Sequence, residues 1–375
     1  MQLKTWLCGL VLLVSMGGAA GRAQTLRQTA DRIGLLVGTA VNPTLFSHSA
    51  YAATLGREFN MIEPENVMKW ATIEPARGVF RFAPGDEVVA FAEAHGMKVR
   101  GHNLLWGIYN PAWVSRGNFT PNDLRQIMRN HILTEVRHYK GKVFAWDVVN
   151  EAFDQNGGLK HSIWYDRPGI GLAQQGTEYI AQAFRWAHEA DPAALLFYND
   201  YAAEGLNAKS DAIYGMVKDF RQRGVPIDGV GLQMHLHGPG QAPASLEKNI
   251  RRLAKLRVQV HITEMDVALP IAARGEAANQ EDLDRQAATY KRVAAICARE
   301  PACTAFQTWG FTDKHSWIPG STHGKKGAAL IFDANYHPKP AFRAILSAFE
   351  EETRAHPRIR QRRLKFEQSS RQDAR

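Results

Sequence analysis

The chain has 375 residues and a formal net charge of +9 at pH 7. No run reaches the roughly 20 apolar residues that a membrane-spanning helix requires, so we expect no membrane span. The positive charge suggests nucleic-acid binding, but basic residues concentrate near the C-terminus, so we expect no nucleic-acid partner.

Residues 1–23 have the pattern of an export signal. Lys4 supplies a positive start, residues 6–16 form a short apolar stretch, and Ala20 or Ala23 offers a cleavage point among small residues. A lipid-modified Cys8 is the alternative, although Trp6 and Leu7 stand where that signal needs small residues. We therefore expect secretion, either outside the cell or into the periplasm.

Residues 24–350 are expected to form one domain, because no linker or low-complexity segment interrupts them. Short apolar strands are expected at residues 35–39, 59–62, 98–101, 143–149, 195–198, 229–232, 259–263 and 305–309. Helical patterns lie between them, for example at residues 86–95, 120–139, 174–190, 208–223, 245–256 and 283–300. This alternation predicts an α/β fold with a parallel sheet, and eight units favour a closed (β/α)₈ TIM barrel.

Residues 351–375 form a basic C-terminal tail. Its basic residues are Arg354, Arg358, Arg360, Arg362, Arg363, Lys365, Arg371 and Arg375. We expect a frayed, solvated end. The alternative is an arm that attracts acidic substituents on a cell-wall polymer or another anionic surface.

Cys297 and Cys303 are the two cysteines that remain after loss of the signal. They lie close in sequence and would face an oxidising compartment, so we expect a disulfide. Two free buried thiols are the alternative.

Polar side chains follow nearly every predicted strand. They are Glu65, Asn66, Lys69, His102, Asn103, Asn150, Glu151, Asn199, Asp200, Gln233, His235, Glu264 and Asp266, and Trp309 closes the last strand. The carboxyl ends of barrel strands converge on one face, where active sites are built. We therefore expect these side chains to form a single site.

Glu151 and Glu264 suit the chemistry of glycosidic bond cleavage, which needs an acid and a second carboxylate on the other side of the sugar carbon. Glu151 ends an apolar run, which suits a proton donor, whereas His235 and Asp266 can keep Glu264 ionised as the nucleophile. A structural salt bridge is the alternative for either glutamate.

Tryptophans supply flat apolar surfaces on which sugar rings pack. The candidates near strand ends are Trp106, Trp309 and Trp317, and those placed for core packing are Trp70, Trp113, Trp146, Trp164 and Trp186. His235 and His237 have the spacing of alternate strand residues, so a zinc site with Glu264 is a further alternative. We expect no metal and no cofactor.

Seven segments together resemble glycoside hydrolase family 10, over residues 36–349. They stand here as ENVMKW from Glu65, GHNLLW from Gly101, WDVVNE from Trp146, YNDY from Tyr198, QMH from Gln233, ITEMD from Ile262 and WGFTDKHSW from Trp309. Typical members are endo-β-1,4-xylanases with a (β/α)₈ fold. The resemblance implies that Glu151 is the proton donor and Glu264 the nucleophile, with His235 and Asp266 hydrogen-bonded around it.

The resemblance also assigns sugar-binding positions. It implies that Asn150, His102, Gln233 and Trp309 hold the sugar at the cleavage point, while Glu65, Asn66, Lys69 and Trp106 hold the next sugar on the non-reducing side. Members often pair two cysteines where Cys297 and Cys303 stand. After Trp106, however, this chain has Gly107, Ile108 and Tyr109 in place of the usual His, variable residue and Gln. Ring packing by Tyr109 in place of that hydrogen bond would alter the preferred chain length.

The expected function is hydrolysis of xylan or xylo-oligosaccharides with retention of anomeric configuration, by a monomer. Retention predicts carboxyl groups about 5 to 5.5 Å apart. One alternative keeps the mechanism but changes the substrate to another β-linked glycan or an aryl glycoside. Another is a glycan-binding protein without catalysis, because fold and function can part company.

Overall fold

The computed structural model describes residues 24–271 and 278–372, so the predicted export signal lies outside the described residues. Within these two ranges, no helix has both the length and the apolar character to cross a membrane. The fold is built around one extensive buried apolar core.

A closed barrel of parallel strands forms the centre of the molecule. Its strands are β1 (Leu36–Val41), β2 (Met61–Pro64), β3 (Lys98–Trp106), β4 (Val143–Asn150), β5 (Leu195–Asp200), β6 (Gly229–Leu232), β8 (Gln259–Val267) and β10 (Cys303–Thr308). Each pairs with the next in this order, and β10 pairs with both β8 and β1, which closes the ring. The predicted TIM barrel is confirmed.

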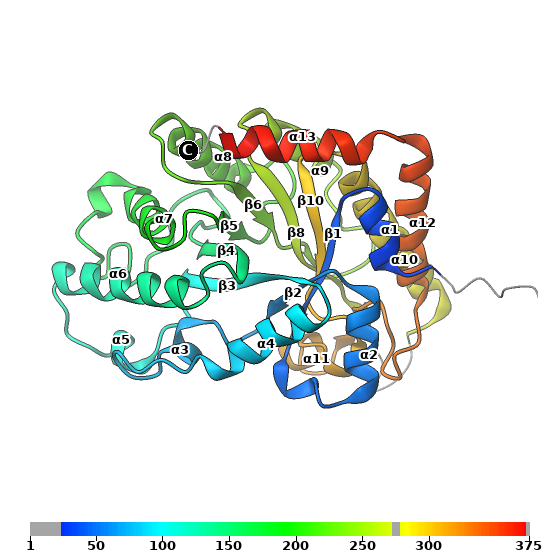
Figure 1. Cartoon of the computed structure of the whole chain (residues 1–375), viewed down its shortest axis with the longest axis horizontal. Helices are drawn as coiled ribbons and strands as arrows, with labels where there is room; N and C mark the ends of the chain where they lie inside the picture. Colours follow the sequence, from blue (N-terminus) through cyan, green and yellow to red (C-terminus); the bar gives the residue numbers. More distant parts are fainter. Residues whose placement is uncertain (1–23, 272–277, 373–375) are drawn as a thin grey trace, which may run out of the picture.

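Helices surround this barrel (Figure 1). The longer ones are α1 (Leu26–Arg32), α2 (Ser49–Glu58), α4 (Ala83–Ala94), α6 (Pro121–His138), α7 (Glu178–Ala190), α8 (Ala208–Gln222), α9 (Leu246–Lys255), α10 (Gln280–Arg299), α12 (Pro340–Ala355) and α13 (Ile359–Gln372). Short pieces near the barrel rim include α3 (Trp70–Ile73), α5 (Ala112–Ser115), α11 (Ile318–Ser321) and β7 (His235–Leu236), which pairs with the end of β8.

Local sequence explains where these elements begin. The side chain of Thr120 accepts a hydrogen bond from the backbone N–H of Asp123, and Pro121 occupies the first helical position of α6. One face of α6 then buries Leu124 and Met128 against the core. The strands are buried along nearly their whole length, because helices cover the barrel outside and side chains fill it inside.

Tryptophan burial follows the sequence expectation. Trp70, Trp146, Trp164 and Trp186 are buried in the main core, and Trp113 packs against it while partly exposed. The tryptophans assigned to packing are therefore core residues.

Several strands extend further than the sequence predicts, β3 and β8 by the most. β3 continues to Trp106 and β8 to Val267, so His102 and Glu264 lie within strands and not after them. The pairing of β3 with β4 has a register shift between His102 and Leu105, and irregular pairing of this kind redirects side chains at a barrel rim.

The C-terminal segment differs most from the sequence expectation. The expectation of a frayed, solvated end is wrong for residues 351–372. α12 continues to Ala355, and α13 lies across the end of the barrel where the strands begin (Figure 1). Its inward residues are Ile359, Arg363, Phe366 and Ser370, which have helical spacing and are buried or partly buried. The basic composition concealed this amphipathic pattern, because Arg363 occupies a position where the pattern requires an apolar residue.

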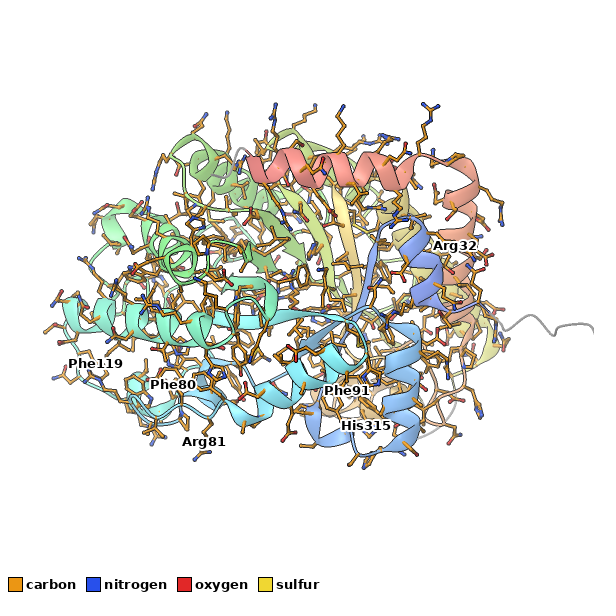
Figure 2. All side chains as sticks on the ribbon, in the orientation of Figure 1. Arg32, Phe80, Arg81, Phe91, Phe119 and His315 are labelled. Atoms are coloured by element: carbon orange, nitrogen blue, oxygen red, sulfur yellow. A yellow bond between two sulfur atoms is a disulfide. The ribbon has the colours of Figure 1, made fainter. Side chains whose placement is uncertain are left out.

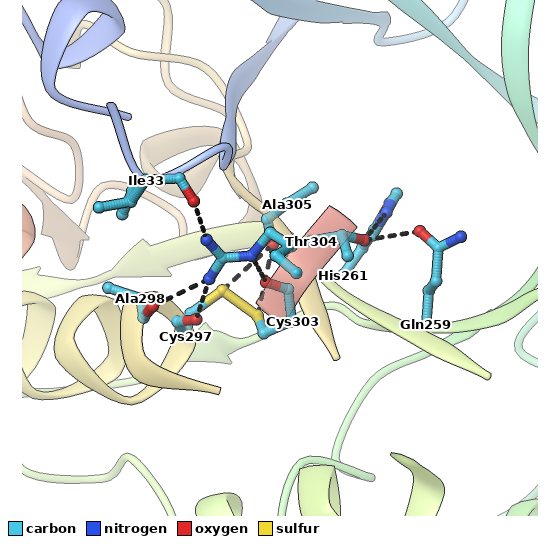
Figure 3. Close-up of a disulfide and its surroundings, with 9 residues drawn as sticks. Ile33, Gln259, His261, Cys297, Ala298, Cys303, Thr304 and Ala305 are labelled. Carbon is cyan, nitrogen blue, oxygen red and sulfur yellow. Dashed lines mark hydrogen bonds between the residues drawn. A yellow bond between two sulfur atoms is a disulfide. The ribbon is translucent and has the colours of Figure 1, made fainter. Parts of the chain in front are cut away.

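Arg363 is fully buried and fastens α13 to the barrel. Its guanidinium donates hydrogen bonds to the carbonyl oxygens of Cys303 at 3.0 Å, Ala298 at 2.9 Å, Cys297 at 3.2 Å and Ile33. These carbonyls surround the Cys297–Cys303 disulfide, whose Cα atoms are 5.1 Å apart (Figure 3). The predicted disulfide is present, and Arg363 connects its two cysteines to Ile33 and to α13.

We expect Arg363→Met to destabilise the fold by about 3 kcal/mol or more, because several buried carbonyls lose their donor. The midpoint of urea unfolding measures this loss. Arg362→Met is the matched control, since Arg362 is the exposed neighbour and its replacement should leave the midpoint nearly unchanged. Equal midpoints for the two variants would show that Arg363 does not fasten α13.

Candidate active site

A cleft with a cavity of about 650 Å³ opens at the carboxyl ends of the barrel strands. The predicted residues that line it are Lys69, His102, Trp106, Asn150, Glu151, Gln233, His235, Glu264, Trp309 and Trp317. Six predicted residues do not line this cavity: Glu65, Asn66, Asn103, Asn199, Asp200 and Asp266. All of them except Glu65 hydrogen-bond to residues that do, and Glu65 interacts with the charge of Lys69. The barrel thus brings the candidate side chains into one site.

Glu151 follows β4 in an unusual backbone conformation, with φ at +57°. Ala202 and Met234, which follow β5 and β6, also have positive φ angles. Residues other than glycine adopt this conformation at a cost of about 1–3 kcal/mol, and such positions cluster at functional sites. The backbone N–H of Glu151 donates to Asn199 O at 2.9 Å, which fixes the turn that directs its side chain into the cleft.

A chain of amide hydrogen bonds connects the two glutamates. Gln233 Nε2 lies 3.1 Å from Glu151 Oε1 and 3.2 Å from Asn150 Oδ1. Asn199 Nδ2 donates to the same Asn150 oxygen at 3.0 Å and to Glu264 Oε1 at 2.7 Å. The amides therefore fix the positions of both carboxylates across the cleft.

Glu264 is held in its ionised form. Burial alone raises the pKa of Glu264, but the hydrogen bond and charge of His235, with smaller effects of His102 and Asn199, lower it to about 2. His235 Nε2 lies 3.0 Å from Glu264 Oε2, and its Nδ1 lies 2.9 Å from Asp266 Oδ2. Although burial lowers the pKa of His235, these two carboxylates raise it well above its usual value. A cationic His235 thus keeps Glu264 anionic at neutral pH.

We expect His235→Gln to move the acid limb of the kcat/KM profile to higher pH, by about one unit or more. Glutamine keeps a hydrogen bond but carries no charge, so burial would dominate and the pKa of Glu264 would rise. Protonated Glu264 cannot act as a nucleophile. As the pH is lowered, the variant would therefore lose activity at a higher pH than the parent does. Initial rates across the acid range measure the limb.

The matched control is His356→Gln, which removes a histidine that pairs with Glu352 at the end of α12. It should leave the acid limb in place. An unmoved limb in His235→Gln would show that another group controls the ionisation of Glu264.

The alternative zinc site fails on geometry. Both ring nitrogens of His235 are engaged by carboxylates, so neither is left to bind a metal. Within residues 24–271 and 278–372, the potential metal-ligand cluster is Glu63, His102 and Asp147. Arg100 already neutralises it, with 3.4 Å between Arg100 Nε and Glu63 Oε2 and an ion pair with Asp147. A metal ion does not fit beside this guanidinium.

The buried cluster of Glu63, Arg100 and Asp147 supports the floor of the cleft. Asp147 Oδ2 lies 3.0 Å from His102 Nδ1, so it orients the ring that lines the cleft. Burial, followed by the charge of Asp147, raises the pKa of Glu63 well above its usual value. Sequence reasoning missed Glu63 because the second strand was expected to end at residue 62, which placed Glu63 outside it.

Aromatic rings and one cation form one end of the cleft. Lys69 Nζ lies 5.3, 5.4 and 5.5 Å from the ring centroids of Trp106, Tyr109 and Trp309. Its Nζ also donates to Asn66 Oδ1 at 3.1 Å. The rings of Trp106 and Tyr109 are stacked with centroids 6.1 Å apart, so Tyr109 provides ring packing beside the cleft.

The opposite end of the cleft contains residues that sequence reasoning did not assign to binding: Tyr201, Ala202, Glu204, Asn207, Leu236, His237, Gln241 and Pro243. His237, named above only in the alternative zinc site, also lines the cleft while exposed. Glu204 Oε1 accepts from the backbone N–H of Met234 at 2.9 Å, which holds that left-handed residue. Of these residues, Tyr201 lies inside a quoted motif, and His237 had a sequence indication only as an alternative zinc ligand.

Trp317 closes one side of the cleft. Its Nε1 donates to Asp266 Oδ2 at 2.9 Å, and its ring meets that of His235 edge-on at 5.2 Å. Trp309 stands similarly against His102, with ring centroids 5.2 Å apart. The two tryptophans therefore provide apolar walls beside polar groups that can bind hydroxyls, an arrangement suited to sugar rings.

The family model of glycosyl hydrolase family 10 matches residues 25–348. This chain belongs to that family. It is 42% identical to endo-1,4-beta-xylanase B of Thermotoga neapolitana, over 91% of this chain and 96% of the relative. It is 38% identical to an endo-1,4-beta-xylanase of Agaricus bisporus, over 84% of this chain and 91% of that protein.

Solved structures of family 10 have the same fold. Native xylanase 10B of Thermotoga maritima superposes with a TM-score of 0.82 at 42% identity, covering 89% of this chain and all of that one. Xylanase 10B of Thermotoga petrophila RKU-1, in complex with xylobiose, gives 0.81 at 41% identity, covering 88% of this chain and 98% of that one. The family 10 chain described here is therefore a glycoside hydrolase.

Proposed function

We propose that this glycoside hydrolase is a secreted endo-1,4-β-xylanase that acts by retaining double displacement. One observation carries the mechanism: Glu264 is an anion oriented by His235 and Asn199, while Glu151 faces the same cleft from another strand. Relatives named as endo-1,4-beta-xylanases support the substrate, and the solved xylobiose complex of a relative supports binding of xylo-oligosaccharides.

In the first step, Glu264 attacks the anomeric carbon as the Glu151 carboxyl protonates the departing oxygen. The bond between sugar and leaving oxygen breaks, and an ester forms between Glu264 and the sugar. Asn150 lies between the two glutamates and can hold a sugar hydroxyl close to the reacting carbon. Such hydrogen bonds strengthen at the transition state.

In the second step, Glu151 is ionised and takes a proton from water, which attacks the same carbon and releases Glu264. Three groups contact this carboxyl. Gln233 and Asn150 both donate to Glu151 Oε1, and Lys160 Nζ lies 3.9 Å from Oε2. Each displacement inverts the anomeric centre, so two displacements retain its configuration.

The substrate is tested by side-by-side release of reducing sugar from xylan, cellulose and mixed-linkage glucan. We expect xylan to be preferred and internal bonds to be cut, giving short oligosaccharides early in the reaction. Preference for a glucan would keep the mechanism and overturn the substrate. Release of single xylose units from chain ends would overturn the endo mode.

Secretion through residues 1–23 is part of the proposal. The Cys297–Cys303 disulfide supports it, because disulfides persist in oxidising compartments. Expression of the full chain in a secreting host, followed by N-terminal sequencing of the exported protein, tests it. We expect a mature N-terminus near residue 24, and retention of the whole chain inside the cell would contradict secretion.

A further inference from the structure

The strongest charged feature outside the cleft is α13, which contains five basic residues and one acidic residue over Ile359–Gln372. It begins after the last residue matched by the family model, residue 348. Arg363 fixes its inner face to the barrel, so the charges lie on an ordered surface. This surface has no part in the cleft described above.

The helix divides its cations between two directions. Arg360 and Arg371 line a cavity of about 660 Å³ at the amino ends of the strands, and Glu367, Asp31 and Asp191 line the same cavity. Arg358, in the turn just before α13, and Arg362 and Lys365 on the helix are exposed and follow one another at intervals of four and three residues. This spacing places the three on one side of the helix. We call them the basic face.

The positive charges of the basic face are not neutralised by neighbouring carboxylates of the described residues. Among residues 24–271 and 278–372, none of its three cations forms an ion pair with a carboxylate. The stripe is narrow, about 10 Å long for seven residues at 1.5 Å each. A line of separate point charges fits a linear polyanion better than a broad planar surface. Leu364 is the one exposed large apolar side chain described on α13, so the helix lacks an apolar face for a bilayer.

The position of this face also bears on its partner. α13 crosses the amino ends of the strands, whereas the cleft opens at their carboxyl ends. β8 alone has nine residues, about 30 Å along the strand, and its two ends lie at opposite ends of the barrel. A polymer held at the basic face would leave the cleft open, and a different part of that polymer, or its neighbour, could enter the cleft.

We propose that the basic face binds an acidic polysaccharide, namely xylan that bears uronate side groups, and retains the enzyme on its polymer. This inference rests on the proposed xylanase function for the choice of polymer. Carboxylates on the sugar chain pair with Arg358, Arg362 and Lys365. Because the pairs are exposed, each is weak and screened by salt, and retention depends on several pairs together.

The test measures binding of the full chain carrying Glu264→Ala, which prevents digestion of the polymer. Two polymers are compared: uronate-bearing xylan, and the same xylan after reduction of its carboxyl groups to alcohols. At about 0.01 M ionic strength we expect tighter binding to the uronate form, and at about 1 M salt we expect that difference to vanish. The triple change Arg358→Gln, Arg362→Gln and Lys365→Gln should weaken binding to the uronate form about tenfold.

The matched control removes three exposed cations from the far side of the molecule: Arg77→Gln, Arg81→Gln and Arg116→Gln. Arg81 lies at the edge opposite α13 (Figure 2). This variant has the same net charge as the triple change and should bind like the parent. A further variant, Arg358→Lys with Arg362→Lys, keeps the charges and should also bind like the parent.

Equal binding to both polymers, or equal loss in the far-side control, would overturn the proposal. So would retention through the same three cations on phosphatidylglycerol vesicles or duplex DNA without retention on uronate xylan. Hydrolysis is measured separately with the unaltered chain. Absence of xylan hydrolysis would overturn the proposed function and leave the binding result intact, so the two failures are distinguishable.

Discussion

Glu264→Ala should lower kcat/KM on xylan by about 10⁴-fold or more, because the first displacement loses its nucleophile. The variant should keep its fold and bind xylo-oligosaccharides, since Trp309, Trp317 and the amides remain. Activity on an aryl β-xyloside measures the loss, and circular dichroism together with oligosaccharide binding shows that the site is otherwise intact.

Added azide separates the roles of the two carboxylates. In Glu264→Ala, azide can occupy the space of the lost carboxylate, attack the anomeric carbon once and yield an α-glycosyl azide. A β-glycosyl azide from this variant, or undiminished hydrolysis, would contradict the assignment of Glu264 as nucleophile.

Glu151→Ala should lower turnover of xylan by about 10²- to 10⁴-fold, the usual contribution of a general acid and base. The loss should depend on the leaving group. A dinitrophenyl β-xylobioside needs no protonation of its departing oxygen, so its first displacement should stay fast while the second, which needs the base, becomes slow. A rapid release of dinitrophenol followed by a slow steady rate would show this.

Azide should accelerate the second step of Glu151→Ala and give a β-glycosyl azide, because it attacks the ester on Glu264. Glu135→Gln is a structural comparison, since Glu135 is a buried acid on α6 that pairs with His131 and does not line the cleft. It should alter stability and leave the leaving-group dependence unchanged. Equal losses on xylan and on the dinitrophenyl substrate in Glu151→Ala would show that Glu151 is not the acid.

The sequence was sufficient for the barrel and for most of the cleft. Polar residues such as Glu151 and Glu264 stand out because buried parallel strands are otherwise apolar, and a barrel forces the carboxyl ends of its strands together. The proposed catalytic pair was therefore predicted from polar residues at strand ends before any resemblance was invoked, with a structural salt bridge as the alternative. The resemblance then assigned binding positions to residues that were already candidates, such as Lys69 and Trp106, and the structure places both in the lining of the same cleft.

Other features could not be read from the sequence. Glu63 lies inside a strand, where its contact with Arg100 depends on β2, β3 and β4 meeting in the barrel interior. Arg363 reads as one more cation in a basic run, and its burial depends on four carbonyls from distant segments. The ionic state of Glu264 needed the distances to His235, because burial and a nearby cation act in opposite directions on its pKa.

The covalent bond between Glu264 and the sugar is tested most directly by mass spectrometry. The fluorine of a 2-deoxy-2-fluoro-β-xylobioside slows both displacements. A good leaving group restores the rate of the first displacement only, so the ester on Glu264 accumulates. We predict one added fluoroxylobiosyl group per chain, on the peptide that contains Glu264. An unmodified chain that releases product of inverted configuration, or an ester on another residue, would contradict the account.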